Sequence, residues 1–228
     1  MDAERLIYPL MKHVLLGPAM RAAFRPAVSG RDGVPARGPV ILAANHLAFV
    51  DSFVLPLVVP RQVFFLGKHE YFTQPGTAGR AKAAFFRGVG AIAVDRSGGR
   101  AAQAALDASA AVLERGGVFA LHPEGTRSPD GRLYRGHTGV ARLALRTGAT
   151  VVPVGIVGTD RVQPPGRAVP RPGRIEVRFG RPLAFTAASG RSAGTGREAR
   201  EITDEVMAAI RALTGQEYVD AYAPRRDV

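Results

Sequence analysis

The sequence predicts an α/β fold: a mixed, mostly parallel sheet flanked by helices, with an amphipathic helix at the N-terminus. Short apolar runs typical of buried strands alternate with segments whose apolar residues recur every three or four positions, as in helices. Several of the apolar runs end in polar residues, as at the carboxyl ends of parallel strands, where ligands bind in such sheets. The length of 228 residues suits one large domain, or one domain with a small appendage.

Residues 2–16 have the pattern of an amphipathic helix, in which the apolar positions are Leu6, Ile7, Leu10, Met11, Val14 and Leu15. Pro9 lies inside this pattern, Gly17-Pro18 is expected to interrupt it, and Met20 to Phe24 continue it. Such a helix either packs on its own domain or lies in a membrane interface. We therefore divide the chain into a membrane-associating helical segment, residues 1–27, and an α/β domain, residues 28–228.

The remaining elements follow from the same periodicities. Residues 28–39 are rich in turn residues and could carry a short edge hairpin, and residues 75–88 are expected to be a mobile connection. Pro153 places its strand at or near a sheet edge, because proline cannot donate to a neighbouring strand. The expected strands are 40–44, 62–67, 91–94, 118–121, 151–157 and 175–179. The expected helices are 53–59, 101–115, 136–147 and 198–213.

The composition is that of a globular protein with a strongly basic charge. The chain is 46% hydrophobic and 22% charged, with a net charge of +12. This charge has two explanations. One is a bias toward arginine, since only three of the 31 basic residues are lysine, and the other is an anionic partner. The absence of cysteine excludes disulfides and thiolate catalysis. The scattered basic residues and an aromatic content of 7% argue against nucleic-acid binding.

Neither a secretory leader nor a membrane-spanning helix is evident. Residues 1–25 lack the charged start, unbroken apolar segment and small-residue cleavage site of a leader. Residues 40–60 come closest to a membrane-spanning helix, but His46 and Asp51 lie in the middle of this stretch. This stretch therefore reads as a strand, a corner and a helix.

Asn45 and His46 follow the first of the predicted strands, and Asp51 begins the next helix. A histidine that accepts a proton near neutral pH needs a partner that holds its tautomer and stabilises its charged form. Residues five apart in a helix lie roughly 140° apart around the axis. His46 and Asp51 can therefore meet only if His46 lies on the turn before the helix.

Other polar groups follow the ends of three further strands. Lys68 comes after the second predicted strand and Arg96 after the third, while Glu124, Gly125, Thr126 and Arg127 follow the fourth. Guanidinium groups bind phosphate through bidentate, charge-assisted hydrogen bonds, and a glycine allows the backbone to approach a ligand closely. A base, an acid and two arginines at one rim describe a proton-abstracting site for a phosphorylated substrate.

Four segments in order resemble the conserved blocks of the glycerolipid acyltransferase family, which includes the 1-acyl-glycerol-3-phosphate and lysophospholipid acyltransferases. These segments span roughly residues 38–160. The chain departs from the family at His122, where the family usually has an aromatic or aliphatic residue. His122 is either a simple strand-end substitution or a pH-sensitive contact. The segments are Asn45-His46-x4-Asp51, Val89-Gly90-x-Ile92-x-Val94-Asp95-Arg96, Pro123-Glu124-Gly125-Thr126-Arg127-Ser128 and Val152-Pro153-Val154-Gly155-Ile156.

The resemblance implies roles for these residues. His46 is then the general base and Asp51 its orienting partner. The implied acceptor-binding residues are Lys68, Arg96, Glu124, Gly125, Thr126 and Arg127. The implied reaction moves a fatty acyl group from acyl-CoA or acyl carrier protein to the hydroxyl of 1-acyl-glycerol-3-phosphate (lysophosphatidic acid), giving phosphatidic acid for phospholipid synthesis.

The thioester is then a co-substrate, and we expect no metal and no further cofactor. We also expect the protein to bind an anionic membrane surface, as a peripheral or monotopic protein on the cytoplasmic face of the cell membrane. Two alternatives remain open. The acceptor could be another lysophospholipid or a glycolipid, or the chain could be a catalytically silent lipid-binding module.

Overall fold

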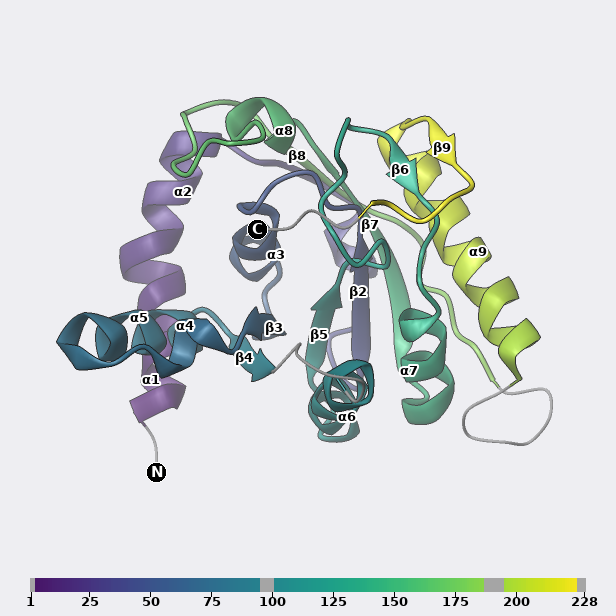
Figure 1. Ribbon diagram of the computed structural model, residues 1–228, viewed down its shortest axis with the longest axis horizontal. Helices are drawn as coiled ribbons and strands as arrows, with labels where there is room; N and C mark the ends of the chain where they lie inside the picture. The colour runs from purple at the N-terminus through teal and green to yellow at the C-terminus, as the bar shows by residue number, and fades with distance from the viewer. Residues whose placement is uncertain (1–2, 95–100, 187–194, 225–228) are drawn as a thin grey trace.

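The computed structural model describes residues 3–94, 101–186 and 195–224. Within these residues the main sheet has seven strands in the order β1-β8-β7-β2-β5-β3-β4 (Figure 1). The five strands from β7 to β4 are parallel, whereas β8 is antiparallel to β7 and β1 is parallel to β8. The predicted mixed, mostly parallel sheet is therefore confirmed.

The strands are β1 (Ala27–Ser29), β2 (Val40–Ala44), β3 (Val63–Lys68), β4 (Ala91–Val94), β5 (Val118–Leu121), β6 (Leu133–Tyr134), β7 (Thr150–Val157), β8 (Glu176–Phe179) and β9 (Tyr218–Val219). The helices are α1 (Ala3–Leu10), α2 (Leu16–Phe24), α3 (Asp51–Val58), α4 (Glu70–Thr73), α5 (Gly76–Gly88), α6 (Ala101–Glu114), α7 (Gly139–Thr147), α8 (Thr159–Val162) and α9 (Gly196–Thr214). A π-helical segment (Met11–Leu15) joins α1 to α2, and a 3-10 turn (Arg31–Gly33) follows β1.

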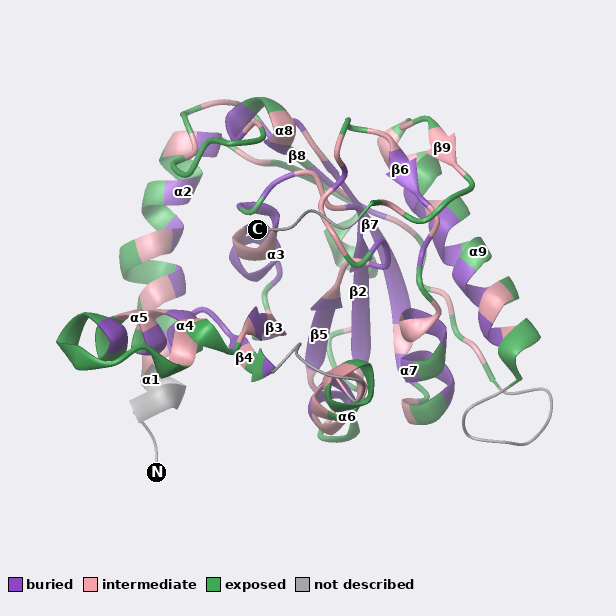
Figure 2. Ribbon diagram, in the orientation of Figure 1, coloured by how far each residue is buried: buried purple, intermediate pink, exposed green. Residues whose placement is uncertain are grey.

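Helices cover both faces of the sheet, and the central strand β2 supplies apolar side chains to both (Figure 2). Val40, Leu42 and Ala44 face the layer that contains α2, α3 and α5. Ile41 and Ala43 face the layer that contains α6, α7 and α9. All five residues are fully buried, as expected for a strand that is apolar along its whole length.

The first helix continues through Gly17-Pro18, so the predicted interruption is wrong. The π-helical turn widens the helix just before this pair. A Cβ at Gly17 would lie 1.7 Å from the carbonyl oxygen of Lys12, so this position requires glycine. Pro18 lies in the first turn of α2, three residues after the π-helical segment.

Tyr8 and Lys12 attach this first helix to α3, to the residues just beyond it and to β3. The Tyr8 hydroxyl donates to the carbonyl oxygen of Pro56 and accepts from the amide of Val63 at 3.1 Å. The Lys12 ammonium donates to the carbonyl oxygens of Val59 and Pro60 just beyond α3. Burial, and secondarily the charge of Arg21, lowers the pKa of Lys12 to about 8.

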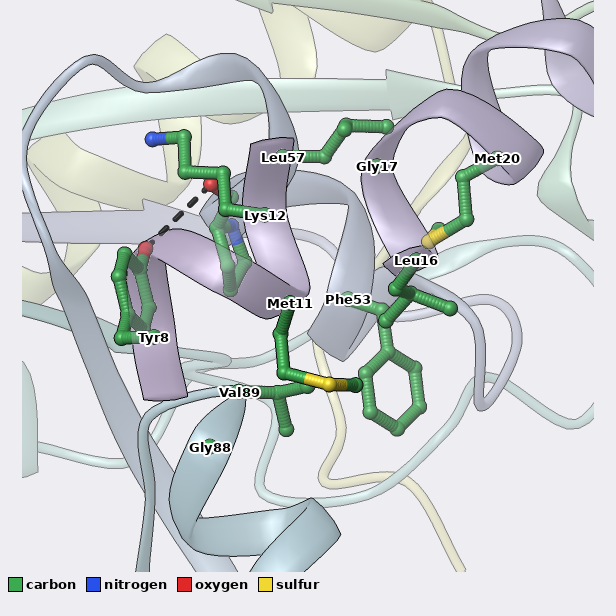
Figure 3. Close-up of a pocket in the computed structure, with 11 residues that line it drawn as sticks. Tyr8, Met11, Lys12, Leu16, Gly17, Met20, Phe53, Leu57, Gly88 and Val89 are labelled. Carbon is green, nitrogen blue, oxygen red and sulfur yellow. Dashed lines mark hydrogen bonds between the residues drawn. The ribbon is translucent and has the colours of Figure 1, made fainter. Parts of the chain in front are cut away.

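A small, mainly apolar pocket lies beside this attachment, where the first helix meets α3 (Figure 3). Met11, Leu16, Met20 and Phe53 are among its lining residues. The opposite side of the first helix is exposed, with 47% of Leu10, 62% of Val14 and 54% of Leu15 accessible to solvent. Across the described part of the chain, every helix is too short or too polar to span a bilayer.

Strand β7, predicted from Pro153 to lie at or near a sheet edge, is the third strand from the β1 edge and lies between β2 and β8, so it is not an edge strand. The Pro153 carbonyl oxygen accepts from the amide of Gly180, on the side toward β8. In a strand, the N–H and the C=O of one residue point to the same side. The hydrogen bond that proline cannot donate at position 153 would therefore have been on the side toward β8 and not toward β2. The ladder to β2, in which Ala43 is opposite Pro153, therefore stays intact.

Two connections also differ from expectation. Residues 76–88, expected to be a mobile connection, form helix α5, which buries Ala83 and Phe86. Gly76 and Gly79, near the start of α5, are the reason that the sequence did not predict a helix here. Gly79 is needed because a Cβ at this position would lie 1.9 Å from the carbonyl oxygen of Gln74. Residues 28–39 contain no hairpin; β1 pairs instead with the distant strand β8.

Candidate active site

The site lies at the carboxyl end of β2, the strand enclosed by β5 and β7. Both of these neighbours run parallel to β2, so all three strands end at the same edge of the sheet. Polar residues that follow parallel strands are therefore brought together here, as the sequence predicts. Asn45 and His46 follow β2, while His122 and Glu124 follow β5.

Asn45 fastens the end of β2 to β7. Its buried side chain accepts from the Ile156 amide at 2.7 Å and donates to the Ile156 carbonyl oxygen at 2.9 Å. It also donates to the Gln216 side chain at 3.0 Å. These paired hydrogen bonds give Asn45, to which the sequence alone assigned no role, a structural one: it fixes the start of the turn that carries His46.

His46 and Asp51 meet as predicted, with His46 on the turn and Asp51 at the start of α3. The Nδ1 atom of His46 donates to Oδ2 of Asp51 at 3.0 Å, and the same oxygen accepts from the amides of Leu47 and Ala48 at 2.7 and 2.8 Å. Asp51 is fully buried, whereas 16% of the His46 side chain is exposed. With Nδ1 protonated and paired, Nε2 keeps its lone pair for accepting a proton.

The pKa of Asp51 is lowered although the carboxyl is buried. Burial is the largest influence and acts to raise this pKa, but the hydrogen bond and charge of His46 and the amide of Ala48 outweigh it. Asp51 is therefore a carboxylate at neutral pH. A carboxylate at this position stabilises the imidazolium that forms when His46 accepts a proton.

Glu124 supports the His46 turn from the neighbouring strand. Its carboxylate, 1% exposed, accepts from the amide of His46 at 3.1 Å and from the amide of Tyr134 at 2.9 Å. The carbonyl oxygen of His46 accepts from the amide of Ser128 at 2.7 Å. The backbone of His46 is thus held on both sides by the segment that follows β5.

Burial raises the pKa of Glu124 to about 7, while the amides of Tyr134 and His46 act in the opposite direction. A carboxyl with a folded-state pKa above its unfolded value stabilises the fold at acid pH. This stabilisation is complete below pH 4.5 and is lost as the pH rises through about 7. The full change is about 3 kcal/mol.

We expect Glu124→Gln to remove this pH dependence and to lower the free energy of unfolding by about 1–3 kcal/mol, because one backbone amide loses its acceptor. Urea denaturation at a series of pH values measures both effects. Glu205→Gln, at an exposed position on α9, is the matched control and should keep the wild-type pH dependence. Equal pH dependence in Glu124→Gln and the control would contradict the prediction.

His122 stacks on His46, with ring centroids 3.9 Å apart and an angle of 7° between the planes. Its Nδ1 atom donates to the carbonyl oxygens of Ala44 and Asn45 at 3.1 and 3.0 Å. Burial, followed by the nearby His46, lowers the pKa of His122 to about 3. His122 is therefore a neutral ring that fixes the plane of His46.

The other predicted residues that the structure describes are Lys68, Gly125, Thr126 and Arg127, and none of them forms a hydrogen bond or ion pair with His46 or Asp51. Gly125 has a φ of 74°, and it precedes the partly exposed Thr126 and Arg127. Lys68 ends β3 at the same edge of the sheet, opposite Val94 of β4. Arg96 lies outside the described residues. Among the described residues, neither Lys68 nor Arg127 forms an ion pair with a carboxylate.

Two contributors to the site were missed from the sequence. Ser128 and Gln163 support the site through contacts between distant segments. The amide of Ser128 donates to the carbonyl oxygen of His46, and the side-chain oxygen of Gln163 accepts from the amide of Val50, 113 positions away. The departure of His122 from the family pattern was a visible signal, but its stacking on His46 was not.

The family model described as acyltransferase matches residues 25–157 of this chain. A chloroplastic 1-acyl-sn-glycerol-3-phosphate acyltransferase of Arabidopsis thaliana is 28% identical over 158 residues, covering 68% of this chain and 43% of that protein. A 1-acyl-sn-glycerol-3-phosphate acyltransferase of Borreliella burgdorferi is 26% identical over 156 residues, covering 68% of this chain and 60% of that protein. The matches thus span about half the length of these two curated relatives.

The crystal structure of the 1-acyl-sn-glycerophosphate acyltransferase of Thermotoga maritima is similar to this chain in fold. The TM-score is 0.67 and the identity 25%, with 92% of this chain and 78% of that one covered. The family model alone matches more than half of the sequence and includes the His46–Asp51 dyad and the Glu124 segment. The chain therefore belongs to the acyltransferase family.

Proposed function

We propose that this chain is a 1-acyl-glycerol-3-phosphate acyltransferase, which transfers a fatty acyl group from acyl-CoA or acyl carrier protein and forms phosphatidic acid. The contact of His46 with the buried carboxylate of Asp51 is the observation that carries the proposal. Such a dyad suits a reaction in which a hydroxyl must lose its proton as it attacks a carbonyl. The names of the Arabidopsis, Borreliella and Thermotoga relatives support lysophosphatidic acid as the acceptor.

The reaction balances without a covalent enzyme intermediate. Nε2 of His46 accepts the proton of the acceptor hydroxyl while the hydroxyl oxygen attacks the thioester carbonyl. The tetrahedral intermediate then collapses, and the carbon–sulfur bond breaks. The imidazolium, stabilised by Asp51, returns the proton to the thiolate, so that an ester and a free thiol leave the site.

The phosphate of the acceptor is proposed to bind to the loop that follows β5. Arg127 has no carboxylate partner among the described residues, and Gly125 and Thr126 add an approachable backbone and a hydroxyl. Lys68 and Arg96 are proposed to complete this phosphate site from the ends of β3 and β4. Glu124, whose two oxygens accept backbone amides, contributes by holding the loop in place.

We expect Arg127→Ala to raise the KM for lysophosphatidic acid about 10–100-fold, since a hydrogen bond to a charged group contributes about 1.5–3 kcal/mol. The KM for acyl-CoA should change much less. A monoacylglycerol that lacks the phosphate serves as the control acceptor and should be used equally by both proteins. Arg142→Ala, on the exposed side of α7, is the matched variant. An unchanged KM for lysophosphatidic acid would place the phosphate elsewhere.

A thioester-release assay with a panel of acceptors tests the proposed function directly. Lysophosphatidic acid should be the preferred acceptor over lysophospholipids with a headgroup and over glycolipids. Preference for one of these others would assign the chain to the alternative acceptor class. The absence of thioester release with every acceptor would favour a silent lipid-binding module.

We also propose that residues 1–27 hold the α/β domain of residues 28–228 on a membrane, as a peripheral protein of the cytoplasmic face. The exposed Leu10, Val14 and Leu15 supply the apolar side chains for such a contact. The buried side of the same helix is attached through Tyr8 and Lys12, so the apolar side faces outward. Sedimentation with anionic vesicles tests this proposal, and failure to sediment would contradict it.

A further inference from the structure

An arginine-rich surface lies at the C-terminal end of the first helix and in the loop packed against it. It comprises six exposed arginines: Arg21, Arg25, Arg161, Arg167, Arg171 and Arg174. None of the six pairs with a carboxylate in the described part of the chain, whereas Arg132, Arg146, Arg178, Arg197 and Arg200 each do. The first group, which we call the arginine surface, therefore keeps its charge available for an external partner.

Backbone hydrogen bonds bring the two segments of this surface together. The amide of Gly173 donates to the carbonyl oxygen of Ala23 at 3.0 Å, and the amide of Ile175 donates to that of Phe24 at 3.2 Å. The guanidinium of Arg171 donates to the carbonyl oxygen of Arg161 at 2.9 Å. In Figures 1 and 2 the loop that follows α8 lies against the upper end of α2 and is mostly exposed.

The arginine surface continues an apolar one. The exposed positions of the first helix are largely apolar and run toward Arg25: Leu10, Val14, Leu15, Pro18, Ala19 and Ala22. Within the loop itself, Val169 is 72% exposed between Arg167 and Arg171. The apolar surface matches the acyl layer of an anionic bilayer, and the unpaired cations next to it match the headgroups.

We propose that the arginine surface is a second membrane contact, which binds anionic lipid headgroups while the apolar side of the first helix enters the acyl layer. This inference rests on the membrane association included in the proposed function. It adds a selectivity that the apolar helix alone lacks, because cations distinguish anionic from zwitterionic lipids.

The same loop is bonded directly to the start of α3. The side-chain amide of Gln163 donates to the carbonyl oxygens of Arg167 and Ala168 at 3.3 and 3.0 Å. Its oxygen accepts from the amide of Val50 at 2.9 Å, one residue before Asp51. The loop that carries Arg167, Arg171 and Arg174 is therefore connected through Gln163 to the residue before α3, the helix that begins with Asp51.

The test compares Arg167→Gln/Arg171→Gln/Arg174→Gln with Arg115→Gln/Arg142→Gln/Arg211→Gln. The second variant removes the same charge from exposed positions on α7 and α9 and just beyond α6, over the other face of the sheet. Each protein is sedimented with vesicles of phosphatidylcholine alone and of phosphatidylcholine mixed with phosphatidylglycerol. Turnover is measured separately in detergent micelles, where no bilayer is needed.

We expect the loop variant to bind the anionic vesicles on the order of 100-fold more weakly than wild type, and the control variant to bind almost as wild type. Binding to phosphatidylcholine alone should be equal in all three, and Leu10→Ser/Val14→Ser/Leu15→Ser should lower binding to both kinds of vesicle. Micellar turnover of the loop variant should equal that of wild type.

Two results would overturn the proposal. One is equal binding of the loop variant and wild type to the anionic vesicles, including no binding by either; if turnover with acyl carrier protein is then lost selectively, the arginine surface is a docking site for an acidic protein. The other is an equal loss of binding in the loop variant and the control variant, which would make the effect one of net charge. A wild-type protein without micellar turnover would instead contradict the proposed function, whatever its vesicle binding.

Discussion

Replacing His46 with alanine is expected to lower kcat by on the order of 10²–10⁴-fold, the usual contribution of a general base. The KM values for both substrates should change little, because the imidazole acts on the proton that moves and not on the bound phosphate. Steady-state thioester release in detergent micelles, with lysophosphatidic acid as the acceptor, measures this loss.

The His46→Ala protein should remain folded, because its turn is held by backbone groups. The amides of residues 46–48 donate to Glu124 and Asp51, and the His46 carbonyl oxygen accepts from Ser128. Thermal unfolding checks this expectation. His69→Ala, at an exposed position before α4, is the matched control and should keep wild-type turnover. Retained turnover in His46→Ala would remove His46 from its assigned role.

Asp51→Asn is expected to lower kcat by a similar factor, although the shape of the side chain is conserved. An asparagine lacks the charge that stabilises the imidazolium. Its single oxygen can still accept from the amides of Leu47 and Ala48 and from Nδ1 of His46, so the loss isolates the effect of the charge. The kcat for acyl transfer should fall, while the KM for acyl-CoA stays close to that of wild type.

The same substitution has a pH signature. Because the folded-state pKa of Asp51 lies below its unfolded value, this carboxylate stabilises the fold above the unfolded pKa of 3.8, and the stabilisation is lost as the pH falls through the folded pKa. Asp51→Asn should lack this loss of stability at acid pH. Urea denaturation at neutral and acid pH measures it, with Asp32→Asn at an exposed position as the control. Wild-type turnover in Asp51→Asn would contradict the assigned pairing.

The contacts of His46 show where sequence reasoning reaches its limit. The geometry of its pairing with Asp51 was predictable, because residues five apart cannot meet within one helix and the contact therefore requires His46 on the preceding turn. Its stacking on His122 and its support by Glu124 both cross 76–78 positions of sequence, and they depend on β5 lying beside β2. Strand order is a property of the assembled sheet, so no local pattern indicates it.

Glycine and proline were misleading for the same reason. Gly79, Gly17 and Pro153 read locally as signs of a loop, a helix break and a sheet edge. In the structure, Gly79 and Gly17 admit a carbonyl oxygen where a Cβ would collide, and Pro153 turns its nitrogen away from β2. Whether such a residue interrupts an element depends on its neighbours in space, which the sequence does not specify.

The sequence by itself determined the α/β class, the periodic helices and strands, the His46–Asp51 spacing and the excess of positive charge. Each of these depends on residues close together in the chain or on composition. Only the tertiary structure decided which strand ends meet, which carboxylate holds the His46 turn and which arginines share a surface. Those outcomes depend on the packing of distant segments, where burial and backbone hydrogen bonding select one arrangement.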